Sequence, residues 1–239
     1  MNASAQTFWL ENLKSASQYN QWIFSQIRPY LGSDVLEVGC GNGNFSVLIA
    51  PHCQKLVALD LDESYVQQTQ TRLRDYSHVE VLAADATEFQ CDRTFDTIVM
   101  LDVLEHIEDD VGTLRALGRL LKPGGQLLVK VPALEALYSP MDRAIGHYRR
   151  YRQTTLADTF TAAGFQKPHV WRFNLAGIPG WWLNGCVLNR TTPPSSQVGL
   201  FDKVVPILQR LEALVPPPLG LSLYGVAALG SLTPGADLP

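Results

Sequence analysis

Three glycines lie directly after a run of apolar residues, in the stretch VLEVGCGNGN at residues 35–44. Gly39, Gly41 and Gly43 allow a sharp turn and a close approach to a ligand, because glycine has no Cβ. The apolar residues that follow predict a helix whose first N–H groups can bind a carboxylate. A nicotinamide-binding turn would have a further glycine at position 44, where this chain has Asn44. The spacing therefore predicts a different ligand site, or a tight turn with no ligand.

A second group of reactive side chains lies in residues 139–152, which hold four arginines and one histidine in a chain of net charge −4. The planar guanidinium of arginine suits a carboxylate or phosphate, and His147 can take up a proton near neutral pH. We expect substrate contacts from three neighbouring residues, Tyr148, Arg149 and Arg150. The segment could instead be a solvated basic turn whose arginines pair with Asp142 or Glu135.

Short apolar segments alternate with amphipathic ones along the first half of the chain. They are residues 34–38, 55–59, 79–83, 97–101 and 126–131. Strands of Val, Leu and Ile without polar alternation are buried on both faces, as in a parallel sheet covered by helices. Residues 168–174 and 221–229 predict a sixth and a seventh strand. We therefore expect an α/β fold with a doubly wound, mostly parallel seven-stranded sheet.

Apolar residues at helical spacing precede and interrupt this sheet. Residues 1–30 predict an N-terminal cap of one or two helices, from which Tyr19 is expected to reach the substrate. Residues 31–174 and 220–230 form the expected ligand-binding domain. Residues 175–219 contain two expected helices and several prolines, and are interpreted as an apolar helical insertion before the last strand. This insertion could be a lid over the pocket, a packing or dimer interface, or a contact with a membrane or lipid.

The glycine motif resembles the first motif of the class I S-adenosylmethionine-dependent methyltransferases, and four later motifs follow in that family's order. These are LVALD, LAADA, FDTIVMLDVLEHIED and LKPGGQLLVKVP. The element GHYRRY resembles one that recurs in a subset of the family. The resemblance implies a Rossmann-like methyltransferase fold with S-adenosylmethionine as cofactor. It also implies the residues that contact the cofactor, which are Glu37, Gly39, Cys40, Gly41, Gly43, Asp60, Leu61, Asp85, Ala86, Leu101 and Asp102.

Several of these residues have alternative roles. The resemblance places Asp60 on the ribose hydroxyls, and a carboxylate, which only accepts hydrogen bonds, suits a diol; Asp60 could also cap a helix. It places Asp85 near the adenine amino group, with the N–H of Ala86 toward the ring, although Asp85 could simply be a turn residue. Glu37 lies within an apolar strand, so we expect it to satisfy backbone N–H groups or the cofactor amine.

One further histidine belongs to these motifs. His106 lies in the element EHI, which in the resembling family is near the cofactor, and we expect it at the start of a helix. It is a second candidate base after His147, or a structural histidine held by the neighbouring acids Glu105, Glu108 and Asp109.

The bulk composition narrows the classes of partner. A net charge of −4 argues against a nucleic-acid partner. The four cysteines lack the spacing of a metal site, so we expect free thiols and no metal. The first residues carry no basic group ahead of a long apolar run, so we expect a cytoplasmic location. The apolar stretch at 173–188 is too short and interrupted to span a membrane.

The expected function is methyl transfer from S-adenosylmethionine to a small, hydrophobic or anionic acceptor, with O-methylation favoured. Such a transfer is an in-line displacement that depends on alignment of the nucleophile and the methyl group. A hydroxyl acceptor would need a base, whereas a carboxylate could be aligned by Arg149 or Arg150. Two alternatives stay open: a nicotinamide-dependent oxidoreductase and a non-catalytic cofactor-binding protein. The sequence does not predict the oligomeric state.

Overall fold

A computed structural model describes residues 3–229 of the chain. A single seven-stranded sheet forms its centre, in the order β3-β2-β1-β4-β5-β7-β6. The strands are β1 (Asp34–Val38), β2 (Lys55–Asp60), β3 (Val79–Ala83), β4 (Phe95–Leu101), β5 (Leu121–Pro132), β6 (Phe165–Phe173) and β7 (Ser222–Leu229). Only β7 runs against its neighbours β5 and β6, and the other pairs are parallel. The expected fold class is confirmed.

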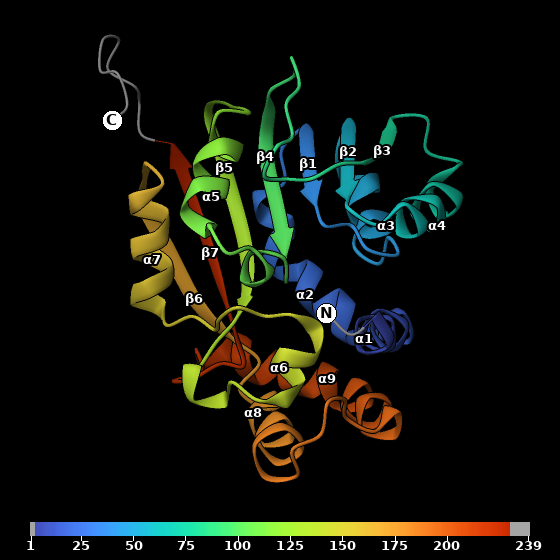
Figure 1. The fold of residues 1–239 in the computed structure, drawn as a ribbon, viewed down its shortest axis with the longest axis vertical. Coiled ribbons are helices and arrows are strands. Elements are labelled where there is room, and N and C mark those ends of the chain that lie inside the picture. Colours follow the sequence, from blue (N-terminus) through green and yellow to red (C-terminus); the bar gives the residue numbers. More distant parts are fainter. Residues whose placement is uncertain (1–2, 230–239) are drawn as a thin grey trace.

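Helices cover both faces of this sheet (Figure 1). They are α1 (Ala3–Ser15), α2 (Ser17–Ile27), α3 (Ser46–Ile49), α4 (Glu63–Leu73), α5 (Asp110–Gly118), α6 (Pro140–Ile145), α7 (Gln153–Ala162), α8 (Gly177–Trp181) and α9 (Ser195–Leu214). Leucines and Phe160 of α5 and α7 join one hydrophobic core, which contains Leu36 and Val38 of β1. Residues of α2, α3 and α4 join the other, which contains Val35.

The two strands that flank β7, β5 and β6, begin earlier than expected, because each contains an irregularity that the apolar pattern does not reveal. The pairing of β4 with β5 jumps from Phe95↔Leu121 to Thr97↔Gln126, so the KPGG turn lies inside β5 as a bulge. The pairing of β6 with β7 skips between Gln166 and His169. Pro168 lies in this gap, and a proline cannot donate a ladder hydrogen bond.

The helix after the glycine turn is short, and the helix expected to begin at His106 begins later. Helix α3 changes to a 3₁₀ turn, Ala50–His52, with Pro51 at its start. His106 lies at the end of a 3₁₀ turn, Leu104–His106, rather than in a helix. Helix α5 begins only at Asp110, where the side chain of Asp109 accepts a hydrogen bond from the N–H of Gly112.

The N-terminal helices and the insertion both reach the carboxyl edge of the parallel strands. Figure 1 shows α1, α6, α8 and α9 gathered beyond this edge. The insertion consists of α8, a π-helical turn Trp182–Val187 and α9. Within residues 3–229, no helix has the length and apolar character needed to cross a bilayer. The division into a cap, a ligand-binding domain and an insertion stays a prediction, and residue 230 lies outside the described part.

Candidate active site

One cavity of about 900 Å³ opens at the carboxyl edge of the sheet. This volume is at the upper end of the roughly 300–1,000 Å³ range of small-molecule pockets. Its wall combines the glycine turn, the ends of β2, β4 and β5, the basic segment, α1 and the insertion. A single space therefore joins the two groups of reactive residues that the sequence separates by about a hundred positions.

The glycine turn has the backbone conformation that its composition predicts. Gly39, Gly41 and Gly43 have φ of +76°, +52° and +79°, values that residues with a side chain rarely adopt. A Cβ on Gly39 would lie 2.3 Å from Cγ2 of Val103. Gly39 and Gly41 line the cavity, whereas Gly43 packs against Thr69 outside it.

Asp60 holds this turn from the end of β2. Its Oδ2 accepts a hydrogen bond of 2.7 Å from the N–H of Gly41, and its Oδ1 accepts one of 3.0 Å from Asp62. Burial raises the pKa of Asp60, although these backbone donors oppose the shift. The N-cap of α4 is Asp62, so the helix-cap alternative for Asp60 is wrong. Asp60 lines the cavity and retains acceptor capacity toward a ligand.

The other expected cofactor residues fall into two groups. Those that line the cavity beside Asp60 are Cys40, Leu61, Asp85, Ala86, Leu101 and Asp102. Asp85 also accepts hydrogen bonds from the backbone N–H and the hydroxyl of Thr87, so it is a turn residue as well. Glu37 does not line the cavity. It is buried against α3, where Ser46 donates a 2.5 Å hydrogen bond to it and burial raises its pKa to about 8.

Helix α1 closes the glycine turn from outside the sheet. The side-chain amides of Asn42 and Asn44 each donate a 3.2 Å hydrogen bond to the carbonyl of Leu10. On the same helix, the ring of Trp9 stacks on Trp181 of α8 with centroids 5.7 Å apart. The N-terminal helix and the insertion thus meet over the cavity. No role was predicted for Asn42, because an asparagine beside these glycines does not indicate a hydrogen bond to an N-terminal helix.

A buried polar cluster, made of Glu105, Asp142, His147 and Arg150, lies beside the cavity. His147 Nδ1 lies 2.9 Å from Asp142 Oδ1, and its Nε2 lies 3.6 Å from Glu105 Oε1. The Nε of Arg150 donates a 2.8 Å hydrogen bond to the same Asp142 oxygen. Burial opposes ionisation of Asp142, but His147 and Arg150 outweigh it and lower its pKa. Asp142 is therefore a carboxylate that orients the imidazole of His147.

Two neighbours of His147 have pKa values that burial shifts against the charged form. Burial and the nearby His147 lower the pKa of His106 to about 4, and the two rings meet edge to face. Burial, helped by the charge of Asp102, raises the pKa of Glu105 well above its ordinary value. Within residues 3–229, neither oxygen of Glu105 nor Nδ1 of His106 has a hydrogen-bond partner. Buried polar atoms are seldom left unpaired, so these atoms are available to a ligand.

An ion pair between a buried lysine and a partly exposed aspartate lies at the end of β4. Lys130 Nζ of β5 contacts the two oxygens of Asp102 at 2.6 and 2.5 Å. Asp102 has a positive φ of 55°. Lys130 was not predicted, because a single lysine within an apolar strand does not indicate on which side of the sheet its amine emerges.

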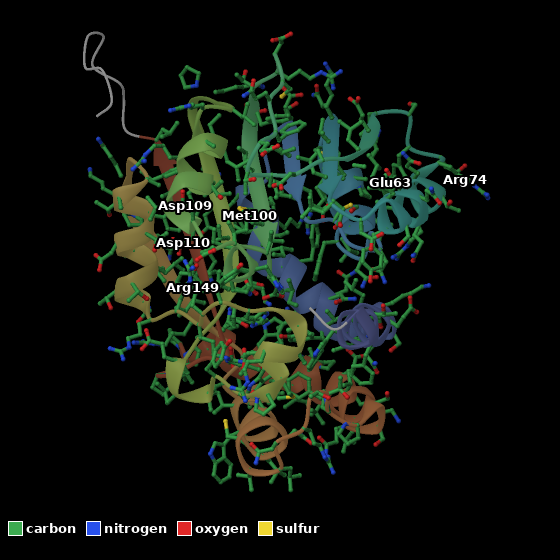
Figure 2. All side chains as sticks on the ribbon, in the orientation of Figure 1. Glu63, Arg74, Met100, Asp109, Asp110 and Arg149 are labelled. Carbon is green, nitrogen blue, oxygen red and sulfur yellow. The ribbon has the colours of Figure 1, made fainter. Side chains whose placement is uncertain are left out.

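Of the expected substrate residues, Tyr19 and Arg150 line the cavity, whereas Tyr148 and Arg149 do not. Tyr19 accepts a 3.2 Å hydrogen bond from the amide of Asn174. Tyr148 is exposed, and the guanidinium of Arg149 contacts Asp110 at 2.8 Å. Figure 2 shows Arg149 beside Asp110, near α5 and α7. The expected substrate contacts of Tyr148 and Arg149 are therefore wrong for this cavity, because neither side chain lines it.

Two arginines of the basic segment form the ion pairs that the alternative interpretation expected, but only Arg152 is solvated, because Arg150 is buried. Arg150 pairs with Asp142, as described above, and Arg152 pairs with Glu135 at 2.6 Å on the surface. The guanidinium of Arg150 also lies 4.4 Å from the ring centre of Trp181, which places it over an aromatic face. Its Nη1 also donates a 2.8 Å hydrogen bond to the carbonyl of Ala133, so Arg150 is held in place and shapes the wall of the cavity.

The cluster could also hold a divalent cation. Glu105, His106 and His147 each offer one ligand atom, and these atoms lie within 4.8 Å of one another. Two imidazoles and a carboxylate are suitable ligands for zinc or iron. The sequence analysis assigned no metal site, because these residues are about forty positions apart.

Comparisons with known proteins agree on one family. The profile described as "Methyltransferase domain" matches residues 5–170. A probable S-adenosylmethionine-dependent methyltransferase of Mycobacterium tuberculosis is 31% identical over 150 residues, 61% of this chain and 54% of that protein. The ubiquinone biosynthesis O-methyltransferase of Stutzerimonas stutzeri is 32% identical over 114 residues, 44% of this chain and 47% of that protein. The chain thus matches about half the length of these curated relatives.

A solved structure has a similar fold. The N-methyltransferase NodS of Bradyrhizobium japonicum, in complex with S-adenosyl-L-homocysteine, superposes with a TM-score of 0.54 and 24% identity. The match covers 67% of this chain and 80% of that one.

Proposed function

Because the chain belongs to the methyltransferase domain family, we propose that it binds S-adenosylmethionine in the cavity and methylates an oxygen atom of a small, largely apolar acceptor. One observation carries this proposal: the glycine turn with Asp60 and the imidazole of His147, which Asp142 holds from behind, line the same cavity. A cofactor and its acceptor can therefore meet without a rearrangement of the sheet.

The cofactor half of the cavity offers the contacts that an adenosyl group requires. Free acceptor capacity on Asp60 suits the ribose hydroxyls, and Asp85 with the N–H of Ala86 suits the adenine ring. Leu101 and Asp102 at the end of β4 then lie toward the methionine part. When bound, the cofactor supplies an activated methyl group on a sulfonium, so the protein needs to align the nucleophile with it.

The acceptor half offers a base and an apolar wall. Asp142 lies 2.9 Å from Nδ1 of His147 and orients the ring, which leaves Nε2 as the nitrogen proposed to take a proton from the acceptor. His106, with a pKa of about 4, is a weak base near neutral pH, so His147 is the proposed base. Trp9, Leu13, Ile145, Trp181 and Phe201 supply apolar surface for the rest of the acceptor.

An amine acceptor is the alternative, because relatives include both an O-methyltransferase and an N-methyltransferase. The buried cluster favours oxygen. Burial raises the pKa of Glu105 well above its ordinary value and so disfavours a carboxylate there, and the carboxylate of Asp142 is already paired with Arg150. A cationic amine at this end of the cavity would therefore lack a ready counter-ion.

The test is methyl transfer from S-adenosylmethionine to a panel of alkyl-substituted phenols and the corresponding anilines. We expect phenols to be methylated, and His147→Asn to lower kcat by roughly 10²- to 10⁴-fold, the range for loss of a general base. The affinity for S-adenosylhomocysteine should stay unchanged. A preference for the anilines, or full activity of His147→Asn, would contradict the proposed acceptor atom and the proposed base.

A further inference from the structure

The outer face of α9 carries an unusually exposed apolar stripe. Its members are spaced four, three, four and three residues apart, which places them on one side of a helix. They are Leu200, Val204, Ile207, Leu211 and Leu214, exposed to 66, 40, 63, 58 and 79%. Large apolar side chains scattered singly on a surface are ordinary, but a continuous stripe marks an interaction site.

The inner face of the same helix is committed to the body of the protein. Val205 is buried in the core, and Phe201 lines the cavity. Both acids of the helix also face inward. Asp202 accepts a 2.8 Å hydrogen bond from the N–H of Tyr19, and Glu212 accepts hydrogen bonds from the N–H groups of Asn174 and Leu175. The stripe therefore cannot turn inward without the loss of these contacts.

The charges left on the outer face are both positive. Lys203 and Arg210 are exposed beside the stripe, and neither forms an ion pair within residues 3–229. Their position contrasts with the net charge of −4 for the whole chain. A helix with an apolar stripe and flanking basic side chains has the pattern of helices that lie in the plane of a membrane interface.

The π-helical turn that follows α8 adds apolar surface at the same end of the molecule. Trp182, Leu183, Val187 and Leu188 are exposed to 42–53%, and α8 and α9 lie together beyond the sheet edge (Figure 1). Tryptophan is enriched at the level of lipid headgroups, where one side of its ring is apolar and the other wet.

We propose that the outer face of α9 docks on the surface of an anionic lipid bilayer, with the stripe in the acyl boundary and Lys203 and Arg210 at the headgroups. Charge distinguishes this occupant from a second copy of the chain. Two copies of the face would bring like charges together, whereas an anionic bilayer complements them. The proposal goes beyond methyl transfer, and it places the membrane on the far side of a helix whose inner face lines the cavity.

The experiment is co-sedimentation of the full chain with vesicles of phosphatidylcholine alone and of phosphatidylcholine mixed with phosphatidylglycerol. We expect strong enrichment on the anionic vesicles only. Ile207→Glu combined with Leu211→Glu should lower the partition coefficient at least tenfold. Lys203→Gln combined with Arg210→Gln should lower it about 25-fold, since each basic side chain near an anionic surface contributes roughly a fivefold factor.

The matched control is Ala213→Glu, which adds a carboxylate to an exposed position of α9 outside the stripe. It should bind vesicles nearly as the wild type does, and circular dichroism should show that all variants fold. Absence of enrichment on anionic vesicles, or equal loss in the control, would overturn the proposal. A dimer in sedimentation velocity that Leu211→Glu dissociates, without vesicle binding, would assign the stripe to a second copy instead. Binding of S-adenosylhomocysteine is independent of all these outcomes.

Discussion

Replacement of Asp142 by asparagine tests the buried cluster most sharply. Asp142 is fully buried, and it accepts hydrogen bonds from Arg150 at 2.8 Å and from the backbone N–H of Ser139 at 2.9 Å, besides its contact with His147. Asparagine keeps the shape but removes the charge. Arg150, itself 4% exposed, then becomes a buried cation without a counter-ion, which typically destabilises a protein by about 3–5 kcal/mol.

The effect should appear in both stability and pH dependence. For a chain of this size, 1 kcal/mol corresponds to about 2–4 °C, so Tm should fall by roughly 6–20 °C. The pKa of Asp142 is lowered in the folded protein, so its contribution is complete above the unfolded pKa of about 3.9. This contribution is lost as the pH falls from that value through the folded pKa. The difference from the wild type should therefore persist near neutral pH and shrink below about pH 4.

The assay is urea unfolding followed by circular dichroism at neutral and acidic pH. The matched control is Glu135→Gln, which breaks the exposed pair with Arg152 in the same segment and should cost less than about 1 kcal/mol. A loss for Asp142→Asn as small as that of the control would refute the reasoning, because the cluster would then tolerate an unpaired buried cation.

Three further predictions follow from other parts of the structure. Glu37→Gln should become more stable relative to the wild type as the pH rises from about 4.3, the pKa of Glu in the unfolded chain, to about 8, its pKa in the folded protein. In this range the folded wild type retains a proton that the unfolded chain releases, so the wild type loses stability. Urea unfolding across this range measures the difference, and a difference that does not change with pH would contradict the prediction. Gly39→Ala should weaken binding of S-adenosylhomocysteine at least tenfold in calorimetry, because its φ is positive and its Cβ would meet Val103, whereas Gly199→Ala on α9 has open space and should not. A chelator should leave methyl transfer unchanged and added Zn²⁺ should inhibit it, because the cation would occupy the side chains proposed for proton transfer; activity lost on chelation and restored by a metal would show that the cluster uses a metal instead.

The parts of the site that the sequence predicts are those that local pattern determines. The glycines after β1 have positive φ. Asp60 is the last residue of β2 and Asp85 lies just beyond the end of β3, so their place at the carboxyl edge follows from the parallel sheet. Buried apolar strands likewise predict the sheet itself.

The parts that the sequence does not predict depend on side-chain direction in irregular segments. Tyr148, Arg149 and Arg150 are consecutive and lie outside regular helix or strand, so no period indicates which of them points inward. The direction of each side chain depends on its ion-pair partner. Arg150 points inward because it pairs with Asp142, and Arg149 points to the surface because it pairs with Asp110. Strand β5 shows a similar limit, since its bulge at KPGG depends on pairing with β4.

The central claim is that the glycine turn and Asp60 bind the adenosyl part of S-adenosylmethionine. The most direct test is isothermal titration calorimetry with S-adenosylhomocysteine and with NAD, on the wild type, on Asp60→Ala and on Asp75→Ala as an exposed control. We predict binding of S-adenosylhomocysteine and none of NAD. Asp60→Ala should weaken that binding roughly 10- to 100-fold, the equivalent of lost hydrogen bonds to a charged group, and Asp75→Ala should not change it. Binding of NAD, binding of neither ligand, or full affinity in Asp60→Ala would contradict the account.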